Sequence, residues 1–252
     1  MTALITGASS GMGRDMARYL SSKGYDLILI ARREDRLKEL EADLQGVNVK
    51  IIPLDLSKAE NCFKLYDMVK DDEVEFLINN AGFGAYGRFS DVPLEKELEL
   101  IDVNIKALHI LTKLFIKDMI KRNKGYILNV GSAAGFLAGP TFSSYYASKN
   151  YVVRLTEAIH EELRQAGSPV KVCCLCPGPV DTAFNKNSGV LVSGKQITAK
   201  QAAREGVDGA FAGKMLVIPG TKMKVVTVGS HLLGEHLSTM INYHIQKKKA
   251  GK

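Results

Sequence analysis

The fold is decided by the opening stretch Thr2-Ala3-Leu4-Ile5-Thr6-Gly7-Ala8-Ser9-Ser10-Gly11-Met12-Gly13. Residues 2–6 have the pattern of a short buried strand, and the glycine-rich loop that follows leads into a helix expected near residues 12–23. Glycine lets the backbone of such a loop approach a pyrophosphate, because it carries no Cβ that would block the approach. The free N–H groups and the dipole of the following helix favour an anion at the same place. A plain strand-to-helix turn is the alternative, but the order of strand, glycine loop and helix favours a nucleotide site.

The rest of the chain alternates short β-branched runs with amphipathic helical stretches. Further strands are expected at residues 27–31, 49–54, 76–79, 126–130, 170–176 and, more weakly, 215–218. Further helices are expected near residues 34–45, 58–70, 94–122, 143–166, 198–211 and 230–248. The strands are almost continuously apolar, which is typical of a sheet covered on both faces. The sequence therefore predicts a single α/β domain over residues 1–252, with a three-layer, doubly wound parallel sheet of the Rossmann type.

The composition limits the classes of function. The chain has 252 residues, of which 46% are hydrophobic and 24% charged, as in ordinary globular proteins. Four of its seven net positive charges come from Lys247, Lys248, Lys249 and Lys252. We interpret this tail as solvated, with weak attraction to anionic lipid or nucleic acid as the alternative. No basic stripe is interleaved with aromatic residues, so we expect no nucleic-acid partner. In the absence of an apolar run of ~18 residues or a secretory signal, we expect a cytoplasmic protein without a membrane partner.

Cysteine and histidine residues give no sign of a metal site. Cys173 and Cys176 form a C-x-x-C pair, but positions three apart in a strand point to opposite faces. We therefore interpret the cysteines as small buried hydrophobic residues. The five histidines show no ligand spacing, and we predict that no metal is bound.

Five further motifs follow the glycine loop in order. They are Asn79-Asn80-Ala81-Gly82, Asp102-Val103-Asn104, Ser132, Tyr145-Tyr146-Ala147-Ser148-Lys149 and Pro177-Gly178-Pro179-Val180-Asp181-Thr182. Together with the T-G-x-x-x-G-x-G loop they resemble the short-chain dehydrogenase/reductase family, and residues 79–87 and 125–182 look most like bacterial ketone and aldehyde reductases. The resemblance implies hydride transfer between a nicotinamide dinucleotide and a carbonyl or secondary alcohol. The alternative is a dinucleotide-sensing binding protein on the same fold.

The expected chemistry depends on Tyr145 and Lys149. These residues are four apart, so they share one face of a helix that begins near Ser143. A nearby cation lowers the pKa of a phenol from its usual ~10, which allows proton exchange near neutral pH. Tyr146 has the uncharged Asn150 at the equivalent position, so we assign Tyr145 as the general acid/base and Tyr146 as a packing residue.

The resemblance implies roles for the neighbouring motifs. Lys149 would also hold the nicotinamide ribose, and Ser132 would polarise the carbonyl. Asn104 would support a water molecule that relays protons from Lys149, although by itself it indicates only a helix kink or a buried amide. Pro177, Gly178, Val180 and Thr182 would flank the nicotinamide.

The end of the second expected strand, Ala31-Arg32-Arg33, indicates which cofactor is used. Ala31 offers no carboxylate to the adenosine ribose of NAD(H), whereas Arg32 can bind a 2′-phosphate through a charge-assisted fork. The alternative is that the two arginines only open a solvated helix, but the helix dipole disfavours cations there. We therefore predict NADP(H). The residues expected to bind it are Gly7, Ser9, Ser10, Gly11, Met12, Gly13, Arg32, Arg33, Asp55, Leu56, Asn80, Ala81, Gly82, Tyr145, Lys149, Pro177, Gly178, Val180 and Thr182.

Substrate choice is expected to depend on residues 83–89, 133–141 and 184–196, with residues 183–197 forming a lid loop. Residues Phe83, Phe136, Leu137, Phe142 and Phe184 indicate a partly apolar pocket for a small carbonyl or alcohol substrate. Residues 230–252, the C-terminal helix and basic tail, could cover the pocket, pair subunits or touch a membrane. For Asp55 the alternative to cofactor binding is a helix cap.

The resemblance also implies a homodimer or homotetramer formed through the helices near residues 94–122 and 143–166. The second faces of these helices carry apolar residues that we interpret as available for pairing, namely Ala107, Leu108, Leu111, Val152, Val153 and Leu155.

Overall fold

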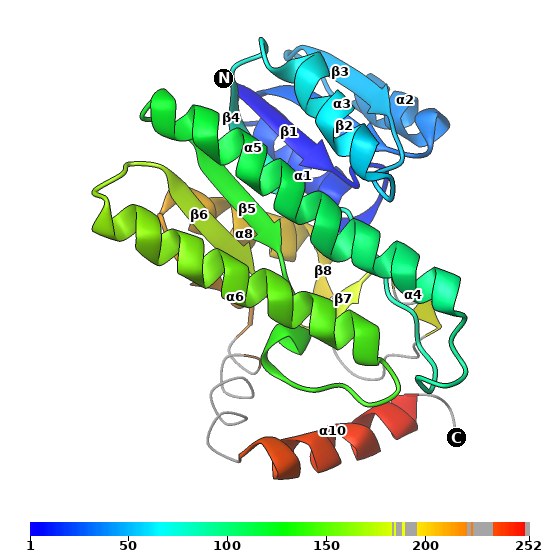
Figure 1. The fold of residues 1–252 in the computed structure, drawn as a ribbon. Helices are drawn as coiled ribbons and strands as arrows, with labels where there is room; N and C mark the ends of the chain where they lie inside the picture. Colours follow the sequence, from blue (N-terminus) through cyan, green and yellow to red (C-terminus); the bar gives the residue numbers. More distant parts are fainter. Residues whose placement is uncertain (183, 185–187, 190–195, 221–222, 224–233, 250–252) are drawn as a thin grey trace.

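A central parallel sheet with the strand order β3-β2-β1-β4-β5-β6-β9 organises the computed structural model (Figure 1). The structure describes residues 1–182, 184, 188–189, 196–220, 223 and 234–249. The strands of this sheet are β1 (Thr2–Thr6), β2 (Asp26–Ala31), β3 (Val49–Pro53), β4 (Val74–Asn79), β5 (Tyr126–Val130), β6 (Lys171–Leu175) and β9 (Leu216–Val217). A separate two-stranded sheet pairs β7 (Val180–Asp181) with β8 (Ile197–Thr198).

The helices alternate with these strands along the chain. They are α1 (Gly11–Ser21), α2 (Glu34–Asp43), α3 (Ala59–Val69), α4 (Leu94–Ile101), the π-helical η1 (Asp102–Ala107), α5 (Leu108–Lys121), the 3-10 turn η2 (Ala133–Phe136), α6 (Ser143–Gln165), α8 (Ala199–Phe211) and α10 (Glu235–Lys249). According to the structure, none of the described helices is long and apolar enough to cross a membrane.

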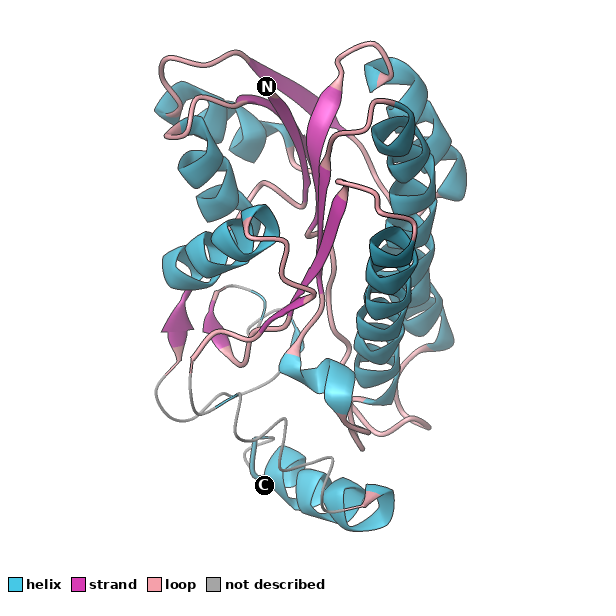
Figure 2. Ribbon diagram, turned by 90° about the vertical axis from the view of Figure 1, so that its left-hand side faces the viewer, coloured by secondary structure: helices cyan, strands magenta, loops and turns pink. Residues whose placement is uncertain are grey.

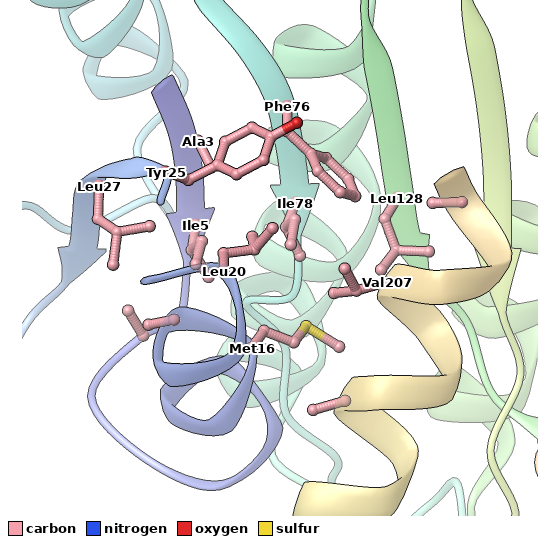
Figure 3. Packing of buried hydrophobic residues seen from close by; sticks show 14 of the residues in the cluster. Ala3, Ile5, Met16, Leu20, Tyr25, Leu27, Phe76, Ile78, Leu128 and Val207 are labelled. Atoms are coloured by element: carbon pink, nitrogen blue, oxygen red, sulfur yellow. The ribbon is translucent and has the colours of Figure 1, made fainter. Parts of the chain in front are cut away.

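Both faces of the sheet are covered by helices, so the molecule has three layers (Figure 2). Ala3 and Ile5 of β1 pack on the side of α1, α2 and α8, whereas Leu4 between them packs on the side of α3 and α5. Figure 3 shows the first of these cores, in which Met16 of α1 and Val207 of α8 lie against the strands. The alternation explains why the strands are apolar at almost every position, and it confirms the predicted doubly wound sheet.

The strand order changes direction between β1 and β4. From β1 the chain proceeds outward to β3, and from β4 it proceeds outward on the other side to β9. Ligands of open α/β sheets bind at the carboxyl ends of the strands beside such a switch point. The glycine loop follows β1, Asn80 follows β4, Ser132 lies beyond β5 and Pro177 lies beyond β6. The topology therefore brings motifs from the whole first two thirds of the chain to one edge.

The helix expected over residues 94–122 is divided into α4, η1 and α5. A π-helical turn holds one residue more than an α-helical turn, and such turns occur often at functional sites. Apolar periodicity continues through the segment, which is why the sequence indicated a single helix. Asn104 lies within η1.

The second faces of α5 and α6 do not carry the spare apolar residues that the sequence predicted. Leu108, Leu111, Val152 and Val153 are each at most 4% exposed, because they pack within the protein's own core. Homo-oligomerisation therefore stays an expectation of the family alone. Most of the expected lid at residues 183–197 lies outside the described residues.

The cysteines are all free and buried. Cys173 packs in the core on the α1 and α8 side, and Cys176 packs with Cys174 on the α6 side. The two ends of the C-x-x-C pair thus face opposite sides of the sheet, as strand geometry predicts. Within the described part of the chain, no group of three His, Cys, Asp or Glu side chains is placed to hold a metal ion.

Candidate active site

The glycine loop after β1 is shaped for close backbone approach. Gly7 and Gly11 have φ angles of +65° and +54°, a region that favours glycine. A Cβ on Gly7 would lie 2.9 Å from the Cα of Ala81, and one on Gly13 would lie 2.4 Å from the carbonyl oxygen of Gly7. Helix α1 begins at Gly11 with no acidic residue in its first turn and no side chain capping its N-terminus. Its free N–H groups and dipole therefore provide a cradle for a phosphate group.

Asn80 holds the two neighbouring strand ends together. Its side-chain Nδ2 donates to the carbonyl oxygens of Thr6 (3.0 Å) and Gly7 (3.1 Å). The hydroxyl of Thr6 accepts in return from the backbone N–H groups of Asn80 and Ala81, each at 3.0 Å. The loop after β4 is thus fixed against the glycine loop, with Ala81 and Gly82 lining the cavity.

The two arginines after β2 reach in different directions. Arg33 donates to the hydroxyl of Ser9 in the glycine loop (3.4 Å), whereas Arg32 forms a 3.0 Å ion pair with Glu99 of α4. The Arg32 side chain is 63% exposed, so this ion pair contributes little to stability and can open. Both arginines line the cavity, as does Asp55, whose carboxylate also accepts from the N–H of Ser57.

The catalytic candidates converge where β5 meets α6. Tyr145 and Lys149 are 8% and 5% exposed, and the Lys149 ammonium lies 5.9 Å from the centre of the Tyr145 ring. Lys149 Nζ donates to the carbonyl oxygen of Val130 at the end of β5 (2.8 Å). Ser132, two residues beyond, lies near the Tyr145 phenol and accepts from the N–H of Ala134. Phenol, hydroxyl and ammonium therefore line one cavity.

Burial acts against the pKa shift that the sequence led us to expect. Burial raises the pKa of Tyr145 to about 12, although the nearby Ser132 opposes this rise. Burial also lowers the pKa of Lys149 to about 8, against the opposing influence of Cys174 and Cys176. The structure thus shifts the pKa of the phenol in the direction opposite to the one that the sequence predicted, because desolvation of the phenol is the largest influence on it.

Asn104 acts on the loop after β4. It is 1% exposed, its Oδ1 accepts from the N–H of Phe83 (3.0 Å) and its Nδ2 donates to the carbonyl of Phe83 (2.9 Å) and to Ser148 (3.1 Å). A Cβ on Gly82 would meet Asn104 Oδ1 at 2.9 Å and Lys149 Nζ at 3.5 Å. Asn104 thus lies behind the wall formed by Gly82, close to Lys149, where it positions the loop.

The comparisons with known proteins agree with this geometry. The profile described as short chain dehydrogenase matches residues 1–190. The chain belongs to this family. SadH of Mycobacterium tuberculosis, described as a candidate oxidoreductase, is 32% identical over 263 residues, covering 97% of this chain and 95% of SadH. An uncharacterized oxidoreductase of Staphylococcus aureus is 32% identical over 184 residues, covering 72% of this chain and 79% of its own.

Solved structures of other short-chain dehydrogenases share the fold. One from Sphingobium yanoikuyae in complex with NADPH has a TM-score of 0.83 and 28% identity, covering 92% of this chain and 93% of the other. One from Burkholderia phymatum in complex with NAD has a TM-score of 0.84 and 27% identity, with the same coverage. The protein is therefore an oxidoreductase of a fold that binds a nicotinamide dinucleotide.

In this short-chain dehydrogenase a single cavity of about 660 Å³ is lined by almost every residue predicted to bind the cofactor. The exception is Gly13, which lies behind the loop against the Gly7 carbonyl and Asn80. Among the catalytic candidates, Ser132, Tyr145 and Lys149 line the cavity, and Asn104 does not.

The apolar part of the dehydrogenase cavity differs in one respect from the expectation. Phe83, Leu137, Phe142 and Phe184 line it, and the Phe142 ring stacks on Tyr145 at 4.5 Å between centroids. Phe136 does not line it, because η2 turns this side chain toward the core that contains Leu108 and Val152.

Sequence reasoning allowed the C-terminal helix to cover the pocket, but it did not find that Tyr146 and particular residues of α10 line the cavity. Tyr146, interpreted as a packing residue, lines the cavity together with Asn242, Ile245 and Gln246 of α10. Its plus-four neighbour Asn150 donates only to backbone carbonyls, which agrees with choosing Tyr145 as the reactive phenol. About 100 residues separate Tyr146 from α10, and no motif in the sequence links them.

Proposed function

We propose that this protein is an NADP(H)-dependent oxidoreductase that transfers a hydride between nicotinamide and a carbonyl or secondary alcohol, with Tyr145 as the general acid/base. The observation that carries the proposal is the buried Tyr145 phenol, near Ser132 and Lys149, in the same cavity as the glycine loop.

The residues present fit the cofactor. The cradle formed by Gly7 and Gly13 leaves no room for a Cβ, and the N-terminus of α1 offers free N–H groups to a pyrophosphate. Arg32 and Arg33 are cations at the adenosine end, where a 2′-phosphate distinguishes NADP(H) from NAD(H). The bound NADPH of the Sphingobium relative supports this choice, although the Burkholderia relative holds NAD. When bound, the cofactor supplies or accepts the hydride.

The chain's own residues then handle the proton. In this proposal Ser132 donates a hydrogen bond to the carbonyl oxygen and so fixes its position beside the phenol. Because burial keeps the pKa of Tyr145 at about 12, the phenol is protonated at neutral pH and can give its proton to the developing alkoxide. Lys149 lies beside it as the cation that stabilises the resulting phenolate. A protonated phenol is the form that carbonyl reduction requires.

Replacing the phenol tests the proposal. In Tyr145→Phe we expect kcat for carbonyl reduction to fall by about 10²–10⁴-fold, because the general acid is lost. The affinity for NADPH should change little, since the aromatic ring remains. Steady-state kinetics and a fluorescence titration with NADPH measure the two effects.

Tyr151→Phe on the same helix is the matched control. Tyr151 is 37% exposed, lies outside the cavity and is hydrogen-bonded to His109. It should retain full activity. Undiminished turnover in Tyr145→Phe would contradict the assignment of the acid. No turnover of any aldehyde, ketone or secondary alcohol by the unaltered protein, despite NADPH binding, would favour the dinucleotide sensor.

From the family alone, we further infer a homodimer or homotetramer in the cytoplasm.

A further inference from the structure

The far end of the substrate cavity is closed by a helix that turns its polar side inward. In α10, Asn242 and Gln246 are 6% and 1% exposed, and both line the cavity. Four large apolar side chains of the same helix are instead 41–49% exposed and lie outside the cavity, namely Leu237, Met240, Ile241 and Tyr243, whereas Ile245 is 46% exposed and lines it. A surface helix ordinarily buries its apolar stripe and exposes its polar one. Packing alone therefore does not explain why the two amides face the cavity.

These inward amides form a polar cluster around the Tyr146 hydroxyl. Gln246 Nε2 donates to that hydroxyl, and the Asn242 side chain lies near it. Asn242 Nδ2 also donates to the carbonyl oxygen of Ala138 (2.7 Å), and the Tyr86 hydroxyl donates to the backbone carbonyl of Gln246 (3.1 Å). The cluster is thus anchored at both ends and holds Gln246 in one place.

One atom of this anchored cluster is left without a partner. Gln246 Oε1 is buried and accepts no hydrogen bond from any described residue. A buried polar atom without a partner is costly, so native proteins rarely leave one without a reason. Gln246 lines the cavity, and its amide oxygen can accept a hydrogen bond but cannot donate one.

The walls between the reactive phenol and this oxygen are mostly apolar. Leu137, Phe142 and Phe184 line that part of the cavity, and the rings of Tyr145 and Tyr146 lie 6.2 Å apart between centroids. A glycine makes room for Tyr146, since a Cβ on Gly139 would lie 2.2 Å from its ring. The cavity therefore offers proton transfer at one tyrosine, an acceptor beside the next, and hydrocarbon surface around both.

We propose that Gln246, fixed by Tyr146, accepts a hydrogen bond from a hydroxyl group that the substrate carries apart from its reacting carbonyl. The substrate class is then an apolar hydroxyketone, or the corresponding diol in the reverse direction. This inference rests on the proposed carbonyl reduction. It makes Gln246 a determinant of specificity and gives it no part in proton transfer.

Matched ketones test the inference. The probes are cyclohexanones and decalones that carry either a hydroxyl or a methyl group at the same ring position, reduced with NADPH. For at least one position, the unaltered protein should prefer the hydroxyl compound over its methyl counterpart by about tenfold or more in kcat/KM. In Gln246→Leu this ratio should fall close to one, through KM more than kcat, while NADPH affinity stays unchanged.

Two further variants separate recognition from damage to the helix. Gln246→Glu keeps an acceptor oxygen and should retain a preference for the hydroxyl compound. Met240→Leu changes an exposed side chain of α10 outside the cavity and should leave the ratio as it was. Failure of the unaltered protein to reduce any ketone or aldehyde would overturn the proposed function and this inference with it. If the unaltered protein reduces ketones but shows no preference for the hydroxyl compound, the inference is overturned and the proposed function is not. The same holds if Gln246→Leu leaves that preference intact.

Discussion

At the scale of single residues, burial and charge compete at the catalytic pair. Burial raises the pKa of Tyr145 to about 12 and lowers that of Lys149 to about 8. Both shifts favour the neutral forms of the two groups, as expected for side chains removed from water. A protonated phenol suits the donation of a proton to an alkoxide, and a phenolate, needed for oxidation, is disfavoured. The spacing of the two residues showed that they share a helix face, but it carried no information about how deeply they are buried.

The preference for NADP(H) belongs to the same scale. In Arg32→Asp we expect kcat/KM for NADPH to fall by about 10- to 100-fold relative to NADH, because a charge-assisted hydrogen bond to the 2′-phosphate is replaced by repulsion. Glu99→Gln is the control, since it breaks the ion pair of Arg32 without removing the arginine. It should leave the preference for NADPH intact or strengthen it. Kinetics with both cofactors measure the ratio, and an unchanged ratio in Arg32→Asp would contradict the choice of NADP(H).

At the scale of elements, the turn from β1 into α1 depends on close contact as well as on the positive φ angles of Gly7 and Gly11. Gly13 shows the close contact most clearly, because its φ is not positive and yet its Cβ would meet backbone and Asn80 atoms at 2.4–2.5 Å. Gly24 is the opposite case, with a φ of +79° and nothing within 4 Å of a Cβ. A substitution at Gly13 therefore tests the effect of crowding, and a substitution at Gly24 tests the effect of backbone strain.

We expect Gly13→Ala to weaken NADPH binding by at least about tenfold, because the loop must move away from Asn80, and to destabilise the protein by about 1–3 kcal/mol. Gly24→Ala should cost about 1 kcal/mol through strain alone and should leave NADPH binding unchanged. Thermal unfolding and a NADPH titration of both variants check this. Equal NADPH affinity in the two variants would show that the contact between the loops does not shape the site.

The elements also show how far the sequence could predict the structure. The predicted bounds of β1 and β5 agree with those in the structure, because strong apolar runs end at glycine or polar residues there. The short strands β7 and β8 and the turn η2 were missed, since two to four residues carry no periodicity. The π-helical turn at Asn104 was missed because it keeps the apolar pattern of its neighbours and changes only the hydrogen bonding.

At the scale of the whole molecule, the sequence predicted the part of the site that lies at the ends of the strands. It did not predict the part that the distant C-terminal helix contributes. Residues at the ends of β1, β4, β5 and β6 meet because parallel strands place their carboxyl ends at one edge. By contrast, α10 lies across that edge through a few polar contacts with residues about 100 or more positions away (Figure 1). The sequence left open whether this helix covers the pocket, pairs subunits or touches a membrane, and in the structure its large apolar side chains are exposed.

This placement makes α10 a wall of the cavity and not a part of the core. Removing residues 235–252 should therefore lower the melting temperature by only a few degrees, because the helix buries little apolar surface and a loss of 1 kcal/mol shifts a domain of this size by about 2–4 °C. NADPH affinity should be retained, since the cofactor residues lie on the sheet edge. KM for ketones should rise by about tenfold or more, because the far end of the cavity is opened to water and the acceptor of Gln246 is lost. Calorimetry and ketone kinetics on the shortened chain measure both effects, and a collapse of the fold together with NADPH binding would show instead that α10 is required for the core.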